Sequence, residues 1–183
     1  FQVVQTSWSG EQVELPDEGE PRIQVKTWMT EDAARRLVAL AGEDLDKLVE
    51  AAKSKDFAPV HLGIKTSLQF TAKLNRSQTA NVYGVLRGSD PKLADEYIIY
   101  TAHHDHLGIG EPDANGDRIY NGAMDNATGV VQLLAIGKAM KALPKPPRRS
   151  IMLLFVAAEE QGLLGSQYYA EHPTVPPGKI AAN

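Results

Sequence analysis

The sequence has 183 residues, of which 43% are hydrophobic and 23% are charged, proportions typical of a globular protein. The formal net charge is −4, and no basic cluster points to nucleic acid or to an anionic membrane surface. The longest fully apolar run, residues 151–158, is too short to span a bilayer. Because cysteine is absent, any metal ligands must be His, Asp or Glu.

The chain begins with Phe1 rather than methionine and carries no signal-peptide pattern. Its last residues, 179–183, show no natural stop signal. We therefore expect the chain to be a piece of a longer polypeptide, so the absence of a targeting segment carries no information about location.

The first half of the chain predicts short strands and a pair of helices. Strands are expected near residues 3–4 and over residues 23–28. Thr30 is a suitable N-cap, acidic residues follow it in the first turn, and an apolar stripe ends at Gly42, which together predict a helix. A second stripe with helical spacing predicts another helix over residues 45–52.

Strand patterns then follow. Residues 67–74 alternate apolar and polar side chains, the period of a half-exposed strand. Residues 81–86 and the β-branched and aromatic run 97–102 predict two further strands. We place a domain boundary near residues 65–75 and divide the chain into residues 1–70 and 71–183.

The last of these strands leads directly into a polar segment that begins with His103. In open α/β sheets, ligands bind beyond the carboxyl ends of strands. His103 can bind a metal through one ring nitrogen while Asp105 accepts the N–H of the other, which fixes the tautomer. Taken alone, the stretch is equally well interpreted as a polar loop that holds three histidines.

The following segment, residues 108–121, is rich in turn-forming residues and is expected to be a surface loop. Its Asp113, Asn115 and Asp117 have calcium-loop spacing. However, Arg118 replaces the required glycine and Met124 replaces the final glutamate, so we reject a calcium site.

A long apolar helix is expected to follow Asp125. This aspartate has two interpretations, as an N-cap of that helix or as a metal ligand.

The run 151–158 is apolar throughout and predicts a strand buried on both faces, as in parallel sheets. Glu159 and Glu160 follow it immediately, and residues 163–170 are expected to form a helix that packs back on the sheet. Two adjacent carboxylates after a buried strand are costly unless they are paired or bind a metal.

These polar side chains all border core elements at one predicted edge of a sheet. The order strand, helix, strand gives a parallel pair, whose carboxyl ends meet at that edge. Imidazole and carboxylate ligands without thiolates suit zinc or a similar divalent ion in a catalytic site. The set comprises His103, Asp105, Asp125, Glu159 and Glu160.

Three segments, 100–108, 120–129 and 158–166, closely resemble the signature segments of the di-zinc aminopeptidases, in the same order. That family also includes glutamate carboxypeptidases, glutaminyl cyclases and transferrin-receptor-like ectodomains. The resemblance implies an α/β zinc-exopeptidase fold, of which the chain holds the N-terminal part: a mixed, mainly parallel sheet flanked by helices. Residues 1–70 more loosely resemble the C-terminal part of a protease-associated domain with its connecting helices.

The resemblance also implies residue roles in a site for two zinc ions. His103 would bind one zinc, Glu160 the other, and Asp125 would bridge both. Glu159 would be the general base, and Asp105 would orient His103. The peptide bond after Asp125 is often cis in this family. His104 and His106 match no ligand position and are expected to be loop or supporting residues.

The implied function is hydrolysis of N-terminal residues from peptides by a metal-dependent exopeptidase. The family's remaining two ligands, an Asp and a His, would lie beyond Asn183, so we expect the chain alone to be inactive. Alternatives are a glutaminyl cyclase or carboxypeptidase of the same fold, or a non-catalytic binding ectodomain. Resemblance alone implies an extracytoplasmic location, periplasmic or secreted.

Overall fold

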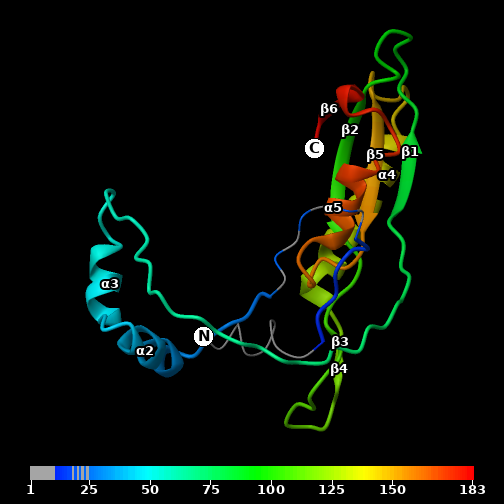
Figure 1. The fold of residues 1–183 in the computed structure, drawn as a ribbon. Coiled ribbons are helices and arrows are strands. Elements are labelled where there is room, and N and C mark those ends of the chain that lie inside the picture. The colour runs from blue at the N-terminus through cyan, green and yellow to red at the C-terminus, as the bar shows by residue number, and fades with distance from the viewer. Residues whose placement is uncertain (1–10, 18, 20, 22, 24) are drawn as a thin grey trace. The chain divides into compact units, whose positions relative to one another are not determined.

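The computed structural model describes residues 11–17, 19, 21, 23 and 25–183. These residues form two compact units (Figure 1). One unit holds the described residues between 19 and 76, and the other holds residues 11–17 and 77–183. The strand expected at residues 3–4 lies outside the described residues.

The helices of the first unit are α2 (Glu31–Leu40) and α3 (Leu45–Ala51), as predicted. The hydroxyl of Thr30 accepts a backbone N–H of the first turn of α2 at 3.2 Å, so it acts as the N-cap. Arg35 of α2 reaches Asp46 of α3 with an N–O distance of 2.8 Å. This hydrogen bond lowers the pKa of Asp46 and ties the two helices together.

The strands predicted over residues 23–28 and 67–74 are not formed in the described residues. In the second segment the apolar side chains are largely exposed, with Leu74 90% exposed. Alternation of apolar and polar residues shows only that a strand would have two different faces. A strand also needs a partner backbone to satisfy its N–H and C=O groups, and neither segment has one in the structure.

The second unit is built on a four-stranded sheet with the order β1-β5-β2-β6. Strands β2 (Tyr97–His103), β5 (Ser150–Val156) and β6 (Ile180–Ala182) are parallel, and β1 (Val82–Leu86) pairs antiparallel with β5. The predicted mixed, mainly parallel sheet is therefore confirmed. The short edge strand β6 had no counterpart in the sequence prediction.

Helices flank both faces of this sheet (Figure 1). On one face, Tyr169 of α5 (Leu164–Glu171) packs against a core that includes Met152 of β5, which is fully buried. On the other face, Gly137 of α4 (Thr128–Lys141) lies against Leu153 of β5. Because neighbouring residues of a strand point to opposite faces, these contacts place the two helices on opposite sides.

The segment predicted as a loop over residues 108–121 contains a small hairpin, made of β3 (Gly108–Ile109) and β4 (Ile119–Tyr120). At its tip, the Asp113 carboxylate accepts backbone N–H groups of residues 115 and 117 at 2.8 and 2.9 Å. The Asp113 carboxylate thus stabilises a local turn.

Among the described residues, no helix has both the length and the apolar character needed to cross a bilayer.

Candidate metal centre

The centre lies where β2 and β5 end side by side, with His103 paired to Val156 in the parallel register. His103 is nearly buried, at 9% exposure. Its Nδ1 lies 3.0 Å from the backbone carbonyl oxygen of Asp105. Since a carbonyl oxygen can only accept, Nδ1 carries the proton. In the neutral imidazole, the other ring nitrogen, Nε2, then keeps a free lone pair.

Asp125 approaches this nitrogen from the segment η1 (Ala123–Ala127), with its Oδ1 2.9 Å from His103 Nε2. The preceding Gly122 has φ +63°, a left-handed conformation that favours glycine. The peptide bond between Asp125 and Asn126 is cis, as the sequence resemblance implied.

Asp125 does not take its alternative role as the N-cap of α4, because Ala127 occupies that position. The side-chain oxygen of Asn126 accepts the N–H of Gly129 at 2.9 Å, in the first turn of α4. Asn126 therefore satisfies a free donor at the start of the helix, and Asp125 is left to face His103.

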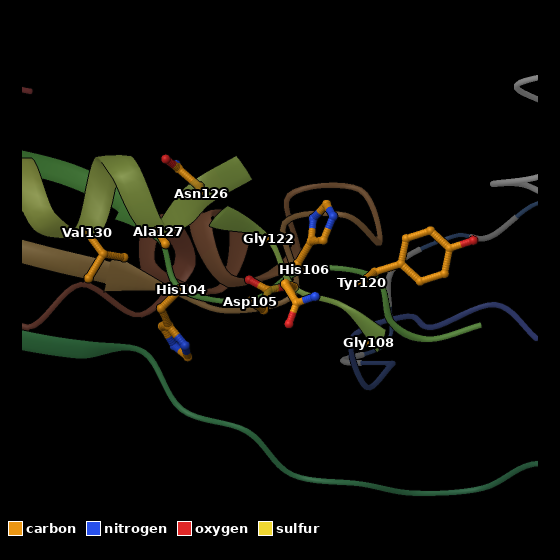
Figure 2. Close-up of a pocket in the computed structure, with 10 residues that line it drawn as sticks. His104, Asp105, His106, Gly108, Tyr120, Gly122, Asn126, Ala127 and Val130 are labelled. Carbon is orange, nitrogen blue, oxygen red and sulfur yellow. The ribbon is translucent and has the colours of Figure 1, made fainter. Parts of the chain in front are cut away.

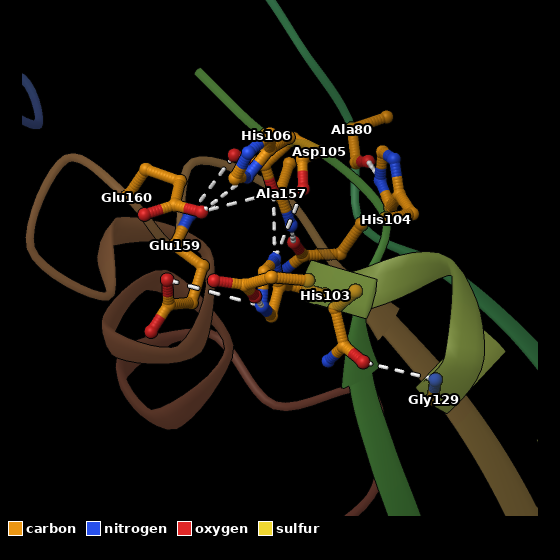
Figure 3. A network of polar contacts seen from close by, with 12 residues as sticks. Ala80, His103, His104, Asp105, His106, Gly129, Ala157, Glu159 and Glu160 are labelled. Atoms are coloured by element: carbon orange, nitrogen blue, oxygen red, sulfur yellow. Dashed lines mark hydrogen bonds and ion pairs between the residues drawn. The ribbon is translucent and has the colours of Figure 1, made fainter. Parts of the chain in front are cut away.

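Glu159 and Glu160 follow β5 in a tight turn and diverge (Figure 3). The Glu159 Oε2 lies 3.9 Å from His103 Nε2, and the Glu159 side chain is 31% exposed. The Glu160 carboxylate turns to His106, whose Nδ1 lies 2.7 Å from Oε1. Adjacent residues thus present one carboxylate beside His103 and one held by a second histidine.

Asp105 links the ends of the two strands. Its carbonyl oxygen accepts from His103, while its nearest carboxylate oxygen is 3.9 Å from the ring, beyond hydrogen-bond distance. The carboxylate instead accepts the backbone N–H of Glu159 at 3.2 Å. Asp105 therefore contacts His103 through its backbone, whereas the sequence had suggested its side chain.

The ligand atoms of His103, Asp125 and Glu160 lie within 4.8 Å of one another. A free imidazole lone pair and a carboxylate oxygen 2.9 Å apart repel each other unless a proton or a cation lies between them. One imidazole and two carboxylates, without thiolate, form a donor set that suits zinc. The residues present therefore fit the divalent ion that the sequence implied.

Asn81, just before β1, supports this turn and was not identified from the sequence. Its amide donates to the carbonyl of Gly165 at 2.8 Å, and its oxygen accepts the N–H of Ala157 at 3.0 Å. Ala157 and Gly165 flank the segment that carries the two glutamates. No sequence pattern pointed to Asn81, because an asparagine before a strand is common and the partners of Asn81 lie 76 and 84 residues away.

A cavity of about 330 Å³ adjoins the centre (Figure 2). Its wall includes His104, Asp105, His106, Tyr120 and Asn126. In Figure 2 the rings of His104 and His106 leave their loop in opposite directions. His104 Nε2 lies 3.1 Å from the carbonyl oxygen of Ala80, so its ring contacts the chain just before β1.

The chain is similar to several known proteins. The sequence profile of peptidase family M28 matches residues 81–183, more than half of the chain. The probable leucine aminopeptidase 2 of Aspergillus oryzae is 27% identical over 136 residues, which are 74% of this chain and 23% of that protein. Aminopeptidase YwaD of Bacillus subtilis is 28% identical over 134 residues, 73% of this chain and 26% of that protein. A solved peptidase M28 precursor from Shewanella amazonensis SB2B shows a TM-score of 0.41 and 36% identity, over 50% of this chain and 18% of that chain.

The chain thus spans about a quarter of the length of the two aminopeptidases. The region that matches the family profile contains His103, Asp125 and Glu160, together with the strands and the helix that position them. The family resemblance expected from the three sequence segments is therefore confirmed. The chain belongs to peptidase family M28.

Proposed function

We propose that the chain provides part of the active site of a zinc-dependent exopeptidase, specifically an aminopeptidase. The observation that carries the proposal is the cluster of His103, Asp125 and Glu160, with the unligated carboxylate of Glu159 beside it. Both relatives described above are named aminopeptidases, which supports the same class of reaction.

In this proposal His103, Asp125 and Glu160 would hold the metal, and Asp125 would serve both ions of a complete two-zinc site. Zinc bound there supplies a Lewis acid that polarises the scissile carbonyl and lowers the pKa of water. Glu159 takes the proton of the attacking water and later delivers it to the leaving amine. Because the Glu159 side chain is 31% exposed, its carboxylate is accessible to both the water and the leaving amine.

Asp105 holds this arrangement in register. Its carbonyl fixes the tautomer of His103, so that Nε2 stays available as a ligand. Its carboxylate anchors the backbone of Glu159. A single residue therefore positions both a metal ligand and the proposed base.

The proposed site needs two further ligands, an Asp and a His, from polypeptide beyond Asn183. We therefore expect the 183-residue chain to bind metal but not to hydrolyse peptides. Robust, chelator-sensitive turnover by a chain of verified mass would refute the need for further ligands.

The experiment that tests the function is the substitution Glu159→Gln in the longer polypeptide that contains this chain. General-base catalysis contributes about 10²–10⁴-fold, so turnover of an aminoacyl substrate should fall by that factor while zinc content stays unchanged. Glu171→Gln is the matched control, because Glu171 is exposed on α5 and bonds only a neighbouring glutamine in the described structure. An unchanged rate in Glu159→Gln would indicate a binding module rather than an enzyme.

Two further proposals rest on resemblance alone. Residues 1–70 would be the C-terminal part of a protease-associated domain, and the protein would work outside the cytoplasm. Limited proteolysis tests the first: cleavage between residues 70 and 77 should release a stable C-terminal piece. Cell fractionation tests the second, and a purely cytoplasmic protein would contradict it.

A further inference from the structure

His106 has a contact that the proposed reaction does not use. Its Nδ1 lies 2.7 Å from Glu160 Oε1, a short distance typical of charge-assisted hydrogen bonds. Both side chains are largely shielded, at 22% exposure for His106 and 18% for Glu160. His106 itself lies outside the group of side chains whose ligand atoms converge on one point.

The chemistry of the pair fixes the direction of the bond. An ionised carboxylate has only acceptor sites, so the proton must lie on Nδ1 of His106. One oxygen of Glu160 is then engaged, and the other is free to bind metal. A glutamate has three rotatable side-chain bonds, and anchoring one oxygen removes much of the conformational freedom that metal binding would otherwise have to restrict.

The backbone before Asp125 lies close to His106. A Cβ built on Gly122 would lie 2.8 Å from the Cβ of His106 and 2.8 Å from the carbonyl oxygen of Asp125. Gly122 thus makes room for His106 and also allows the turn that presents Asp125. His106 therefore contacts the carboxylate of Glu160 and lies close to the segment that carries Asp125.

We propose that His106 is a positioning residue for the metal centre, which presets the Glu160 carboxylate against Asp125 before the metal arrives. This inference rests on the proposed function, because it assumes that Glu160 is a metal ligand. In metal sites, loss of a hydrogen-bond partner of a ligand typically reduces metal affinity by about 10–100-fold. Removing His106 should have an effect in that range.

The test compares zinc affinity in three variants of the 183-residue chain by competition with a chromogenic chelator. His106→Ala should weaken zinc binding by about 10–100-fold. His106→Asn should recover most of the affinity, because its amide N–H takes the place of Nδ1–H. His104→Ala is the matched control from the same loop. Its zinc affinity should stay within about threefold of that of the unaltered chain, since the His104 ring faces Ala80.

Cobalt absorption spectra distinguish a positioning role of His106 from a merely structural one, which would leave the spectra unchanged. The intensity and position of the visible bands report the ligand geometry, so His106→Ala should change them and His106→Asn should restore them. Equal zinc affinity and identical spectra in His106→Ala would overturn the inference and leave the proposed function standing. Failure of the unaltered chain to bind zinc or cobalt would instead overturn the metal centre itself, and the inference with it.

A second measurement needs no variant, so it remains decisive if His106→Ala does not fold. Long-range ¹H–¹⁵N NMR of the unaltered, zinc-loaded chain identifies which imidazole nitrogen carries the proton. We expect the proton on Nδ1 of His106 both before and after zinc is added. A metal-bound Nδ1 would show that His106 is a ligand, and would overturn the positioning role.

Discussion

Replacing Asn81 by alanine should destabilise the second unit, although Asn81 is no part of the proposed chemistry. The change removes the hydrogen bonds to the carbonyl of Gly165 and from the N–H of Ala157. Ala157 is only 2% exposed, so water cannot replace the lost acceptor. Leaving a buried polar group without a partner costs about 1–3 kcal/mol, and a typical hydrogen bond contributes about 1 kcal/mol. We therefore expect Asn81→Ala to lower the free energy of unfolding by about 2–4 kcal/mol.

The assay is urea denaturation followed by far-UV circular dichroism, combined with hydrogen exchange at the Ala157 amide. Tryptophan fluorescence is unsuitable, because the described residues of this unit, 11–17 and 77–183, contain no tryptophan. Asn81→Asp is an informative intermediate, since it keeps an acceptor for Ala157 and loses the donor to Gly165. Asn121→Ala is the control, because its amide makes an exposed contact 3.2 Å from the carbonyl of Ile119.

Two results together would refute this reasoning. One is an unfolding free energy of Asn81→Ala within about 0.5 kcal/mol of the unaltered chain, the range of neutral surface substitutions. The other is unchanged exchange protection at Ala157. If stability falls but the Ala157 amide stays protected, then the loss comes from Gly165 and the estimate for the buried N–H is wrong.

Further predictions concern two helical glycines and one exposed carboxylate. Gly165→Ala should lower the free energy of unfolding by about 1–3 kcal/mol, because its Cβ would overlap the backbone oxygen of Ala157. Gly137→Ala should keep the free energy of unfolding within about 1 kcal/mol of that of the unaltered chain, since the nearest atom to its Cβ is the flexible end of Leu153. Equal denaturation midpoints for Gly165→Ala and Gly137→Ala would contradict this difference. Hydrogen bonds from the backbone of residues 117 and 115 lower the pKa of Asp113. The hairpin tip should therefore be fully ordered above the ordinary aspartate pKa of about 3.9 and loosen as pH falls through the lowered value, and NMR amide shifts at 115 and 117 that stay constant during acid titration would contradict this.

The sequence was most informative where local chemistry decides the structure. Thr30 and the acidic residues after it predicted the start of α2, and the apolar run 151–158 predicted β5. Both signals depend on the segment itself, through a helix cap in one case and burial on both faces in the other. Residues 67–74 had an equally regular pattern and form no strand. Their alternation described the faces of a strand but contained no information about a partner.

The candidate site likewise has residues that the sequence predicted and contacts that it did not predict. The three side chains of the cluster were predictable, because His103, Asp125 and Glu160 each stand near the end or start of a core element. Their supports were not predictable, because these depend on pairs far apart in sequence. His106 and Glu160 are 54 residues apart, and Asn81 and Gly165 are 84 residues apart. No local pattern distinguishes such a histidine or asparagine from one in an ordinary loop.

The spacing of His103 and Asp105 has a physical explanation in the register of the sheet. Because β2 and β5 are parallel neighbours in register, His103 lies beside Val156, and the chain continues past both ends at the same edge. Two residues after His103, the backbone carbonyl of Asp105 reaches the ring Nδ1, and its side chain reaches across to the N–H of Glu159. An asparagine at 105 would keep the carbonyl contact and could still accept from Glu159 through its amide oxygen. The negative charge would be lost, and with it the stronger, charge-assisted bond to the backbone of the proposed base. The carboxylate of Asp105 therefore supports the position of Glu159, whereas the tautomer of His103 depends on the backbone carbonyl of Asp105.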